Sequence, residues 1–185
     1  MYAKLLLLTF LLASCASPQI ALFSLDAPGG IEPAQNQLPL TLSVGQPGAL
    51  PGYDTSRMAY VVKPHQIEYF SKNQWVDSPG KMLLPILVRT LSQRFRAVVK
   101  SPARGDMRLD SEIVMLRQEF SESASRVHLV VRAQILDRRG VMTTREFDIF
   151  ENCPQNDPYG GVLAANRAVA RLAVEISDFC AASHP

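Results

Sequence analysis

The sequence predicts an α+β fold, in which a single antiparallel-rich sheet is covered by two amphipathic helices. Several short segments alternate apolar and polar side chains, which is typical of strands with one covered face. Two longer segments place apolar residues at helical spacing along one broad face. Proline and glycine gather between these segments, where they favour turns and loops.

The first elements are two strands separated by a loop. Residues 19–25 are apolar enough for a short strand, and residues 27–37 are rich in Pro, Gly, Asn and Gln, which predicts a loop. Residues 38–44 alternate leucine and valine with polar residues and predict a second strand. Residues 45–52 contain two prolines and three glycines and predict another loop.

A hairpin is predicted next, from strands at residues 57–62 and 66–70. Because side chains alternate along a strand, Tyr69 and Phe70 should point to opposite faces. Residues 71–74 are polar and are predicted to form a turn.

The first helix is predicted over residues 79–95. Asp77 or Ser78 can serve as its N-cap, and Pro79 suits the first helical position. Pro85 lies inside the helix and should bend it, because its ring removes one backbone hydrogen bond.

The second half of the chain reads as four strands and a second helix. The strands are expected at 97–100, 109–120, 126–137 and 141–151, with a basic loop at 101–108, a tight turn at 138–140 and a loop at 152–161. The helix should run from about residue 161 to 179, with its apolar residues on one stripe. The two helices therefore have one sheet to cover.

The beginning of the chain has the features of a secretory signal. Lys4 supplies a positive charge, and the apolar run at 5–12 is much too short to span a bilayer. The run ends in Leu12-Ala13-Ser14-Cys15, which resembles the lipobox of a bacterial lipoprotein. We therefore expect residues 1–14 to be a signal peptide and Cys15 to be the lipidated N-terminus of a single domain, residues 15–185. The alternative is an ordinary cleaved signal with a chance cysteine.

The resemblance to lipoproteins also implies a location. Ala16 and Ser17 follow the cysteine, where a signal for retention in the inner membrane usually carries Asp. The chain is therefore expected on the periplasmic face of the outer membrane. Only a few residues separate Cys15 from the first strand, so the folded domain should lie close to the lipid headgroups.

Residues with the potential for chemistry form no recognisable constellation. The histidines His65, His128 and His184 share no metal-ligand spacing, and no nucleophile or phosphate-binding motif is present. We expect no enzymatic activity, no metal and no cofactor. Cys153 and Cys180 are expected to stay reduced, because the second helix would hold them apart; a disulfide is the alternative.

Two groups of residues are candidates for interactions. Tyr69 and Trp75 are large amphipathic residues that could contact a partner protein, although Trp75 could equally cover the core at the start of the first helix. Basic residues cluster at the end of that helix and in the loop beyond it: Arg89, Arg94, Arg96, Lys100, Arg104 and Arg108. They could meet anionic headgroups or an acidic partner, or be a solvated face. The net charge of +2 does not favour nucleic acid.

The order of several features resembles one protein family. These are the run Pro51-Gly52-Tyr53-Asp54, Arg57, Ile67-Glu68-Tyr69, Trp75, Pro79, the spacing of Leu83, Leu87 and Leu91, and a C-terminal helix rich in Ala and Leu. Together with the lipobox they resemble the ABC-type transport auxiliary lipoprotein component family, which includes the small lipoprotein of Pqi-type and other MCE-associated systems.

The resemblance implies a role in moving lipids between the two membranes of a Gram-negative envelope. The ATPase, the permease and the MCE-domain protein would be separate chains, and this chain would dock the periplasmic conduit at the outer membrane. Self-association is left open. The alternative function is that of a structural or assembly lipoprotein of the outer membrane with no transport partner.

Overall fold

The computed structural model describes residues 19–26 and 37–183. The predicted signal peptide and Cys15 lie outside these residues. The elements, in chain order, are β1 (Ala21–Phe23), β2 (Leu38–Val44), β3 (Gly48–Ala49), β4 (Arg57–Val61), β5 (Glu68–Trp75), α1 (Pro79–Arg94), β6 (Phe95–Lys100), β7 (Met107–Phe120), β8 (Ser125–Leu136), β9 (Met142–Asn152) and α2 (Pro158–Ala182). The predicted α+β class is confirmed.

The strand β7 organises the sheet. Along one edge it pairs with β8, which pairs in turn with β9, and both ladders are antiparallel and long. Along its other edge β7 pairs in parallel with three short strands, first β2, then β3 and then β4. The remaining strands extend the sheet beyond these: β6 pairs with β2, β5 with β4, and β1 with β5.

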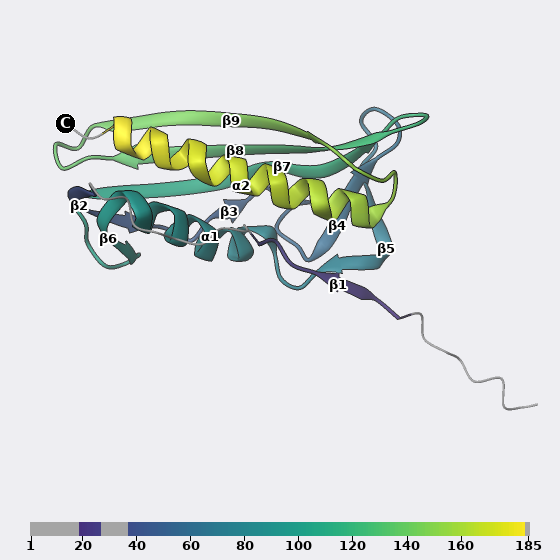
Figure 1. Cartoon of the computed structure of the whole chain (residues 1–185), viewed down its shortest axis with the longest axis horizontal. Coiled ribbons are helices and arrows are strands. Elements are labelled where there is room, and N and C mark those ends of the chain that lie inside the picture. Colours follow the sequence, from purple (N-terminus) through teal and green to yellow (C-terminus); the bar gives the residue numbers. More distant parts are fainter. Residues whose placement is uncertain (1–18, 27–36, 184–185) are drawn as a thin grey trace, which may run out of the picture.

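Both helices lie on one face of this sheet (Figure 1). The helix α2 packs on β8, β9 and α1, and α1 packs also on β6. The predicted alternation in β8 is confirmed, since its inward residues Val127, Leu129, Val131, Ala133 and Ile135 are buried. The opposite face of β8 presents charged residues, so the core lies only between the sheet and the helices.

The start of each helix follows from local sequence. The N-cap of α1 is Ser78, with Pro79 at the first helical position as predicted. The helix α2 begins at Pro158, because the side chain of Asp157 accepts a hydrogen bond from the Gly160 amide at 2.7 Å. Pro85 lies within an uninterrupted α1, and a bend at this residue stays a prediction.

Residues 71–74 do not form the predicted turn, and the loop predicted at 152–161 ends earlier, because α2 begins at Pro158. Residues 71–74 instead continue β5 as far as Trp75, although their side chains are polar. The cause is a distant partner, since Ala21–Phe23 of β1 pairs with Asn73–Trp75 of β5. The Val76 amide also donates a hydrogen bond to the Phe23 carbonyl at 2.8 Å. The two-residue strand β3 was also not predicted, because its residues lie in a stretch rich in Pro and Gly.

The described residues contain no helix that is both long enough and apolar enough to cross a bilayer.

Candidate functional site

Trp75, predicted either to contact a partner or to cover the core, lies in the core. Its side chain is only 5% exposed and belongs to the main hydrophobic cluster, four residues before α1 begins. The indole is therefore not exposed in the isolated chain, and a contact of Trp75 with a partner stays a prediction. Its burial agrees with the alternative interpretation, in which Trp75 covers the core where the helix starts.

Tyr69 is half-buried and already engaged within the chain. Its hydroxyl donates a hydrogen bond to the Gly52 carbonyl at 3.0 Å. The guanidinium carbon of Arg57 lies 3.8 Å from the centre of its ring, which places a cation over the aromatic face. These contacts hold the loop before β4 against β5, and a contact of Tyr69 with a partner stays a prediction.

Phe70 joins an aromatic cluster with Tyr60 and Phe120. The rings of Tyr60 and Phe70 are stacked with centroids 4.5 Å apart, and Phe120 meets both edge-on. The hydroxyl of Tyr60 donates a hydrogen bond to Glu68 at 2.7 Å, and this bond raises the pKa of Tyr60. As predicted, the side chains of Phe70 and Tyr69 point to different faces of β5: Phe70 borders the pocket beside α2, whereas Tyr69 contacts Gly52 and Arg57.

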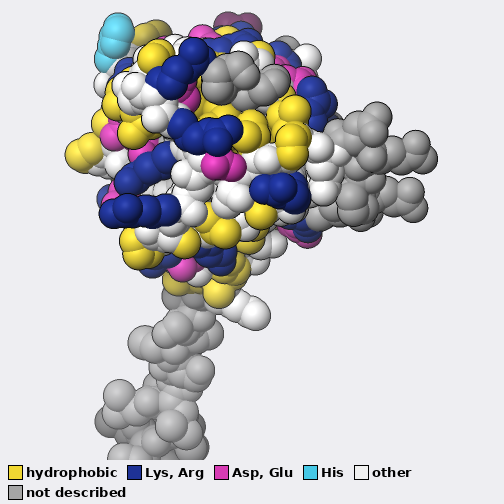
Figure 2. Space-filling view, turned by 90° about the vertical axis from the view of Figure 1, so that its left-hand side faces the viewer, with side chains coloured by type: hydrophobic (Ala, Val, Ile, Leu, Met, Phe, Trp, Pro, Cys, Tyr) yellow, Lys and Arg dark blue, Asp and Glu magenta, His cyan; other side chains and the backbone are white. Residues whose placement is uncertain are grey.

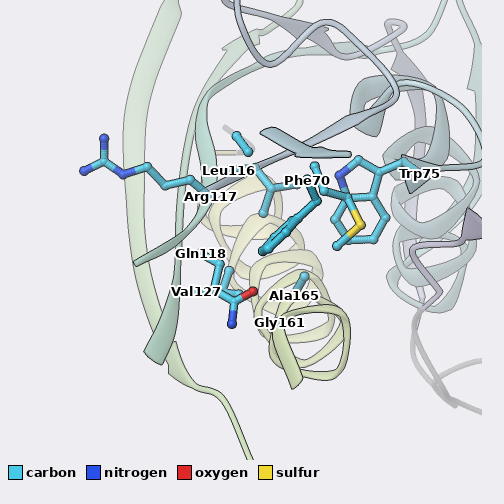
Figure 3. Close-up of a pocket in the computed structure, with 10 residues that line it drawn as sticks. Phe70, Trp75, Leu116, Arg117, Gln118, Val127, Gly161 and Ala165 are labelled. Carbon is cyan, nitrogen blue, oxygen red and sulfur yellow. The ribbon is translucent and has the colours of Figure 1, made fainter. Parts of the chain in front are cut away.

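The aromatic residues border a small pocket between the sheet and α2 (Figure 3). Phe70 and Trp75 lie on one side of it, and Gly161 and Ala165 of α2 lie on the other, while the side chain of Arg117 points away. The pocket has room for about 10 Å³, which is about the space of one water molecule. An acyl chain or a small-molecule ligand does not fit there.

Gln118 connects three elements beside this pocket. It is 3% exposed, and its amide nitrogen donates hydrogen bonds to the Ser125 hydroxyl at 2.8 Å and the Asp157 carbonyl at 3.0 Å. The side chain approaches α2 closely because Gly161 has no Cβ; an added Cβ would lie 2.8 Å from the amide carbon of Gln118. Gln118 therefore fixes the start of α2 against β7 and β8.

A charged cluster centres on Glu119, on the sheet face away from the helices. The carboxylate accepts hydrogen bonds from Arg117 at 2.7 Å and Arg126 at 3.1 Å, and it lies 3.2 Å from the ring nitrogen of His128. Burial alone would raise the pKa of Glu119, but these partners outweigh it and lower that pKa. His128 also contacts Asp148 at 2.8 Å, so the cluster joins β7, β8 and β9 through polar contacts.

Metal ligands and reactive thiols do not assemble within residues 19–26 and 37–183. No group of three His, Cys, Asp or Glu side chains there is arranged to hold a metal ion. Cys153 and Cys180 are free, as expected. Burial raises the pKa of both thiols, that of Cys180 to about 12, so neither is an activated nucleophile. The absence of enzymatic activity stays a prediction.

The predicted basic residues differ in their partners. Arg89, Arg94 and Arg108 make ion pairs with Asp26, Asp178 and Asp110 at 3.1, 3.6 and 2.8 Å. Arg96, Lys100 and Arg104 are exposed, and no acidic group of the described part of the chain lies within 4.0 Å of them. Basic side chains gather on the end of the molecule where β2 and β6 lie (Figure 2).

The fold is shared with solved structures of low sequence identity. A crystal structure of a protein from Xanthomonas campestris is 18% identical, with a TM-score of 0.78, and the match covers 86% of this chain and 94% of that one. A second, of an uncharacterized protein, is 16% identical with a TM-score of 0.69, over 88% and 99% of the two chains. At these identities the likeness concerns the fold alone. No curated protein matches the chain.

The described residues thus form one mixed sheet with both helices on one face, which is an α+β architecture. Residues 23–177 match the family model of the ABC-type transport auxiliary lipoprotein component, and the chain belongs to that family. The family resemblance of the sequence is thereby confirmed. The chain is accordingly a lipoprotein-type auxiliary component of an ABC transporter.

Proposed function

We propose that this protein is the lipid-anchored, periplasmic auxiliary component of an MCE-type ABC lipid transport system, and that it docks the periplasmic conduit at the outer membrane. The family match carries the proposal, since it covers residues 23–177 and names a transport auxiliary lipoprotein. The lipobox ending at Cys15 supports the anchor, and the residues after it support the outer membrane.

The anchor would keep the domain near the membrane. Five residues separate Cys15 from Ala21, and the six fully extended steps between them span at most about 22 Å. Acyl chains stabilise membrane attachment by about 0.8 kcal/mol for each buried methylene, and two or more chains make the attachment durable. The folded domain would then work within reach of the headgroups.

Docking suits this domain better than carrying lipid. Sites for small molecules usually enclose about 300–1,000 Å³, whereas the apolar pocket between the sheet and α2 has room for about 10 Å³. On this proposal the lipid passes through the partner chains, and this chain holds them in place. Such a role requires no catalytic residue, no metal and no cofactor.

The experiment is mass spectrometry of the proteins that co-purify with the tagged, natively lipidated chain after mild detergent extraction. Recovery of an MCE-domain protein with its permease and ATPase is the expected result. Recovery of the chain alone, or with only an outer-membrane β-barrel, would contradict the proposal and favour the structural or assembly role.

A further inference from the structure

The anchored end and the basic end of the domain lie far apart along β7. Gln74 of β5 pairs both with Leu22 of β1 and with Arg57 of β4, and Ala59 of β4 pairs with Arg117 of β7. Arg57 lies two residues before Ala59 in a strand parallel to β7, so it is level with Met115, two residues before Arg117. β1 therefore lies at the height of Met115, beyond the middle of β7. The basic residues lie at the other end, where β7 begins with Met107.

The anchor cannot reach that end. The eight residue steps of strand from Met107 to Met115 span about 26 Å, whereas the six steps from Cys15 to Ala21 span at most about 22 Å. In Figure 1, β1 lies toward one end of the long axis and β2 and β6 lie at the other. A lipid anchored at Cys15 therefore does not by itself bring the basic end to the membrane.

We define the basic end as residues 94–110 together with residues 136–142. These segments contain seven basic and three acidic residues, whereas the whole chain has a net charge of only +2. The two segments are in contact, since Arg138 and Asp106 form an ion pair at 3.6 Å. The surplus positive charge is therefore concentrated at this end of the protein.

Three of the basic residues are available to a partner. Arg96 and Lys100 belong to β6, which is an edge strand of the sheet, and Arg104 belongs to the loop after it. All three are exposed and have no acidic neighbour within the described ranges. No ion pair between described residues has to be broken when these three side chains enter an interface.

Apolar surface and a hollow accompany these charges. Leu136, Val141 and Met142 are 38%, 56% and 60% exposed. A hollow of about 240 Å³ lies at the loop, and its lining includes Ser43, Ser101, Pro102, Arg104 and Arg108. The space-filling view shows apolar side chains between the basic ones (Figure 2). Protein interfaces commonly combine exposed apolar residues with charges that complement the partner.

We propose that the basic end docks an acidic surface of the periplasmic conduit protein, with a carboxylate side chain of that partner entering the hollow beside Arg104. The proposal deepens the proposed function and rests on it. A protein partner is favoured over the membrane that holds the anchor, because the anchor and the basic end are separated along the sheet.

The test reverses charge at this end in the natively lipidated full chain. In the double variant Arg96→Glu and Arg104→Glu, recovery of the conduit protein by co-purification should fall at least tenfold. The matched control is Lys63→Glu and Lys72→Glu, which changes the same charge at exposed residues of the β4–β5 hairpin. The control should retain recovery within twofold. Equal recovery with both double variants would overturn the proposal.

Cross-linking identifies the occupant directly. A photoreactive residue placed at position 104 in intact cells should give an adduct with the conduit protein, and one placed at position 72 should not. An adduct with lipid, with a second copy of this chain, or with nothing overturns the basic-end proposal. If the wild-type chain still co-purifies with the transporter subunits, the proposed function survives that result; if the wild type recovers none of them, the proposed function fails as well.

Discussion

Replacing Trp75 by Ala tests whether this residue supports the core or an interface. Its side chain is 5% exposed and borders the same pocket as Met58, Phe70 and Leu116. Truncating a buried aromatic side chain usually costs about 3–5 kcal/mol, because transfer energy is lost and a cavity remains. In a domain of this size each kcal/mol lowers the melting temperature by about 2–4 °C. A fall on the order of 10 °C is therefore expected.

The assays are thermal denaturation for the melting temperature and urea denaturation for the free energy of unfolding, both on the purified full chain and both followed by circular dichroism. The chain has a single tryptophan, so fluorescence of the unsubstituted protein reports on Trp75 alone. Its emission should move to longer wavelength on unfolding, and iodide should quench it weakly until the protein unfolds. The control is Val76→Ala at the adjacent exposed residue, which should change stability by no more than about 0.5 kcal/mol.

A loss of less than about 1 kcal/mol for Trp75→Ala, or ready quenching of the folded protein by iodide, would refute this reasoning. Either result would indicate that the indole is exposed, and a contact with a partner would again be the better interpretation. If the loss is as large as expected, failure of a Trp75 variant to recover partners reports unfolding. Only variants of exposed residues then test the docking surface.

Four further predictions concern other parts of the chain. The Cys15→Ser variant protein should be absent from the membrane fraction or should accumulate as an uncleaved precursor. Recovery of the variant in the outer-membrane fraction at the normal level would contradict the lipid anchor. Gly161→Ala should lower the free energy of unfolding by about 1–2 kcal/mol in urea denaturation, because displacing Gln118 costs more than the roughly 1 kcal/mol gained in helix propensity; a more stable variant would contradict the close approach. Burial alone would raise the pKa of Glu119, but its hydrogen-bonded partners have the larger effect, so the pKa lies below its usual value. The carboxylate therefore contributes its full stabilisation above about pH 4.5 and loses it as the pH falls through the lowered pKa. The difference in urea midpoint between the protein and Glu119→Gln should therefore shrink below that pH, and a constant difference would count against the ionic cluster. Cys180 should resist alkylation by iodoacetamide until the protein unfolds, because burial raises its pKa to about 12; rapid labelling of the native protein would show that the thiol is accessible.

Most elements were predictable because their signals are local. The alternation in residues 126–137 and the helical spacing in residues 79–95 gave β8 and α1 to within one residue at each end. Pro79 marks the start of α1, and the Gly and Pro residues before β4 mark loops. These signals depend on neighbours a few positions away, which the sequence itself contains.

The candidate site was less predictable, because it depends on partners far along the chain. Polar residues 71–74 form part of β5 because strands elsewhere in the chain pair with it: β1, about 50 positions earlier, and β4. The burial of Trp75 follows from the same pairing, since β1 and β5 carry it into the core. The role of Gln118 depends on a glycine in α2 more than 40 residues away. An exposed polar turn and the edge of a sheet have the same composition, so composition does not separate them.

The sequence by itself determined the α+β class, the order of the main strands and helices, the lipobox resemblance at Cys15 and the family, because each depends on residue types at short and fixed spacings. Only the tertiary structure decided that three short strands share one edge of β7. It also decided that Arg96, Lys100 and Arg104 have no acidic partner among the described residues, while Arg94 and Arg108 are paired. The physical reason is distance: burial, ion pairing and parallel strand pairing arise between residues that are remote in the chain, and only folding brings them together.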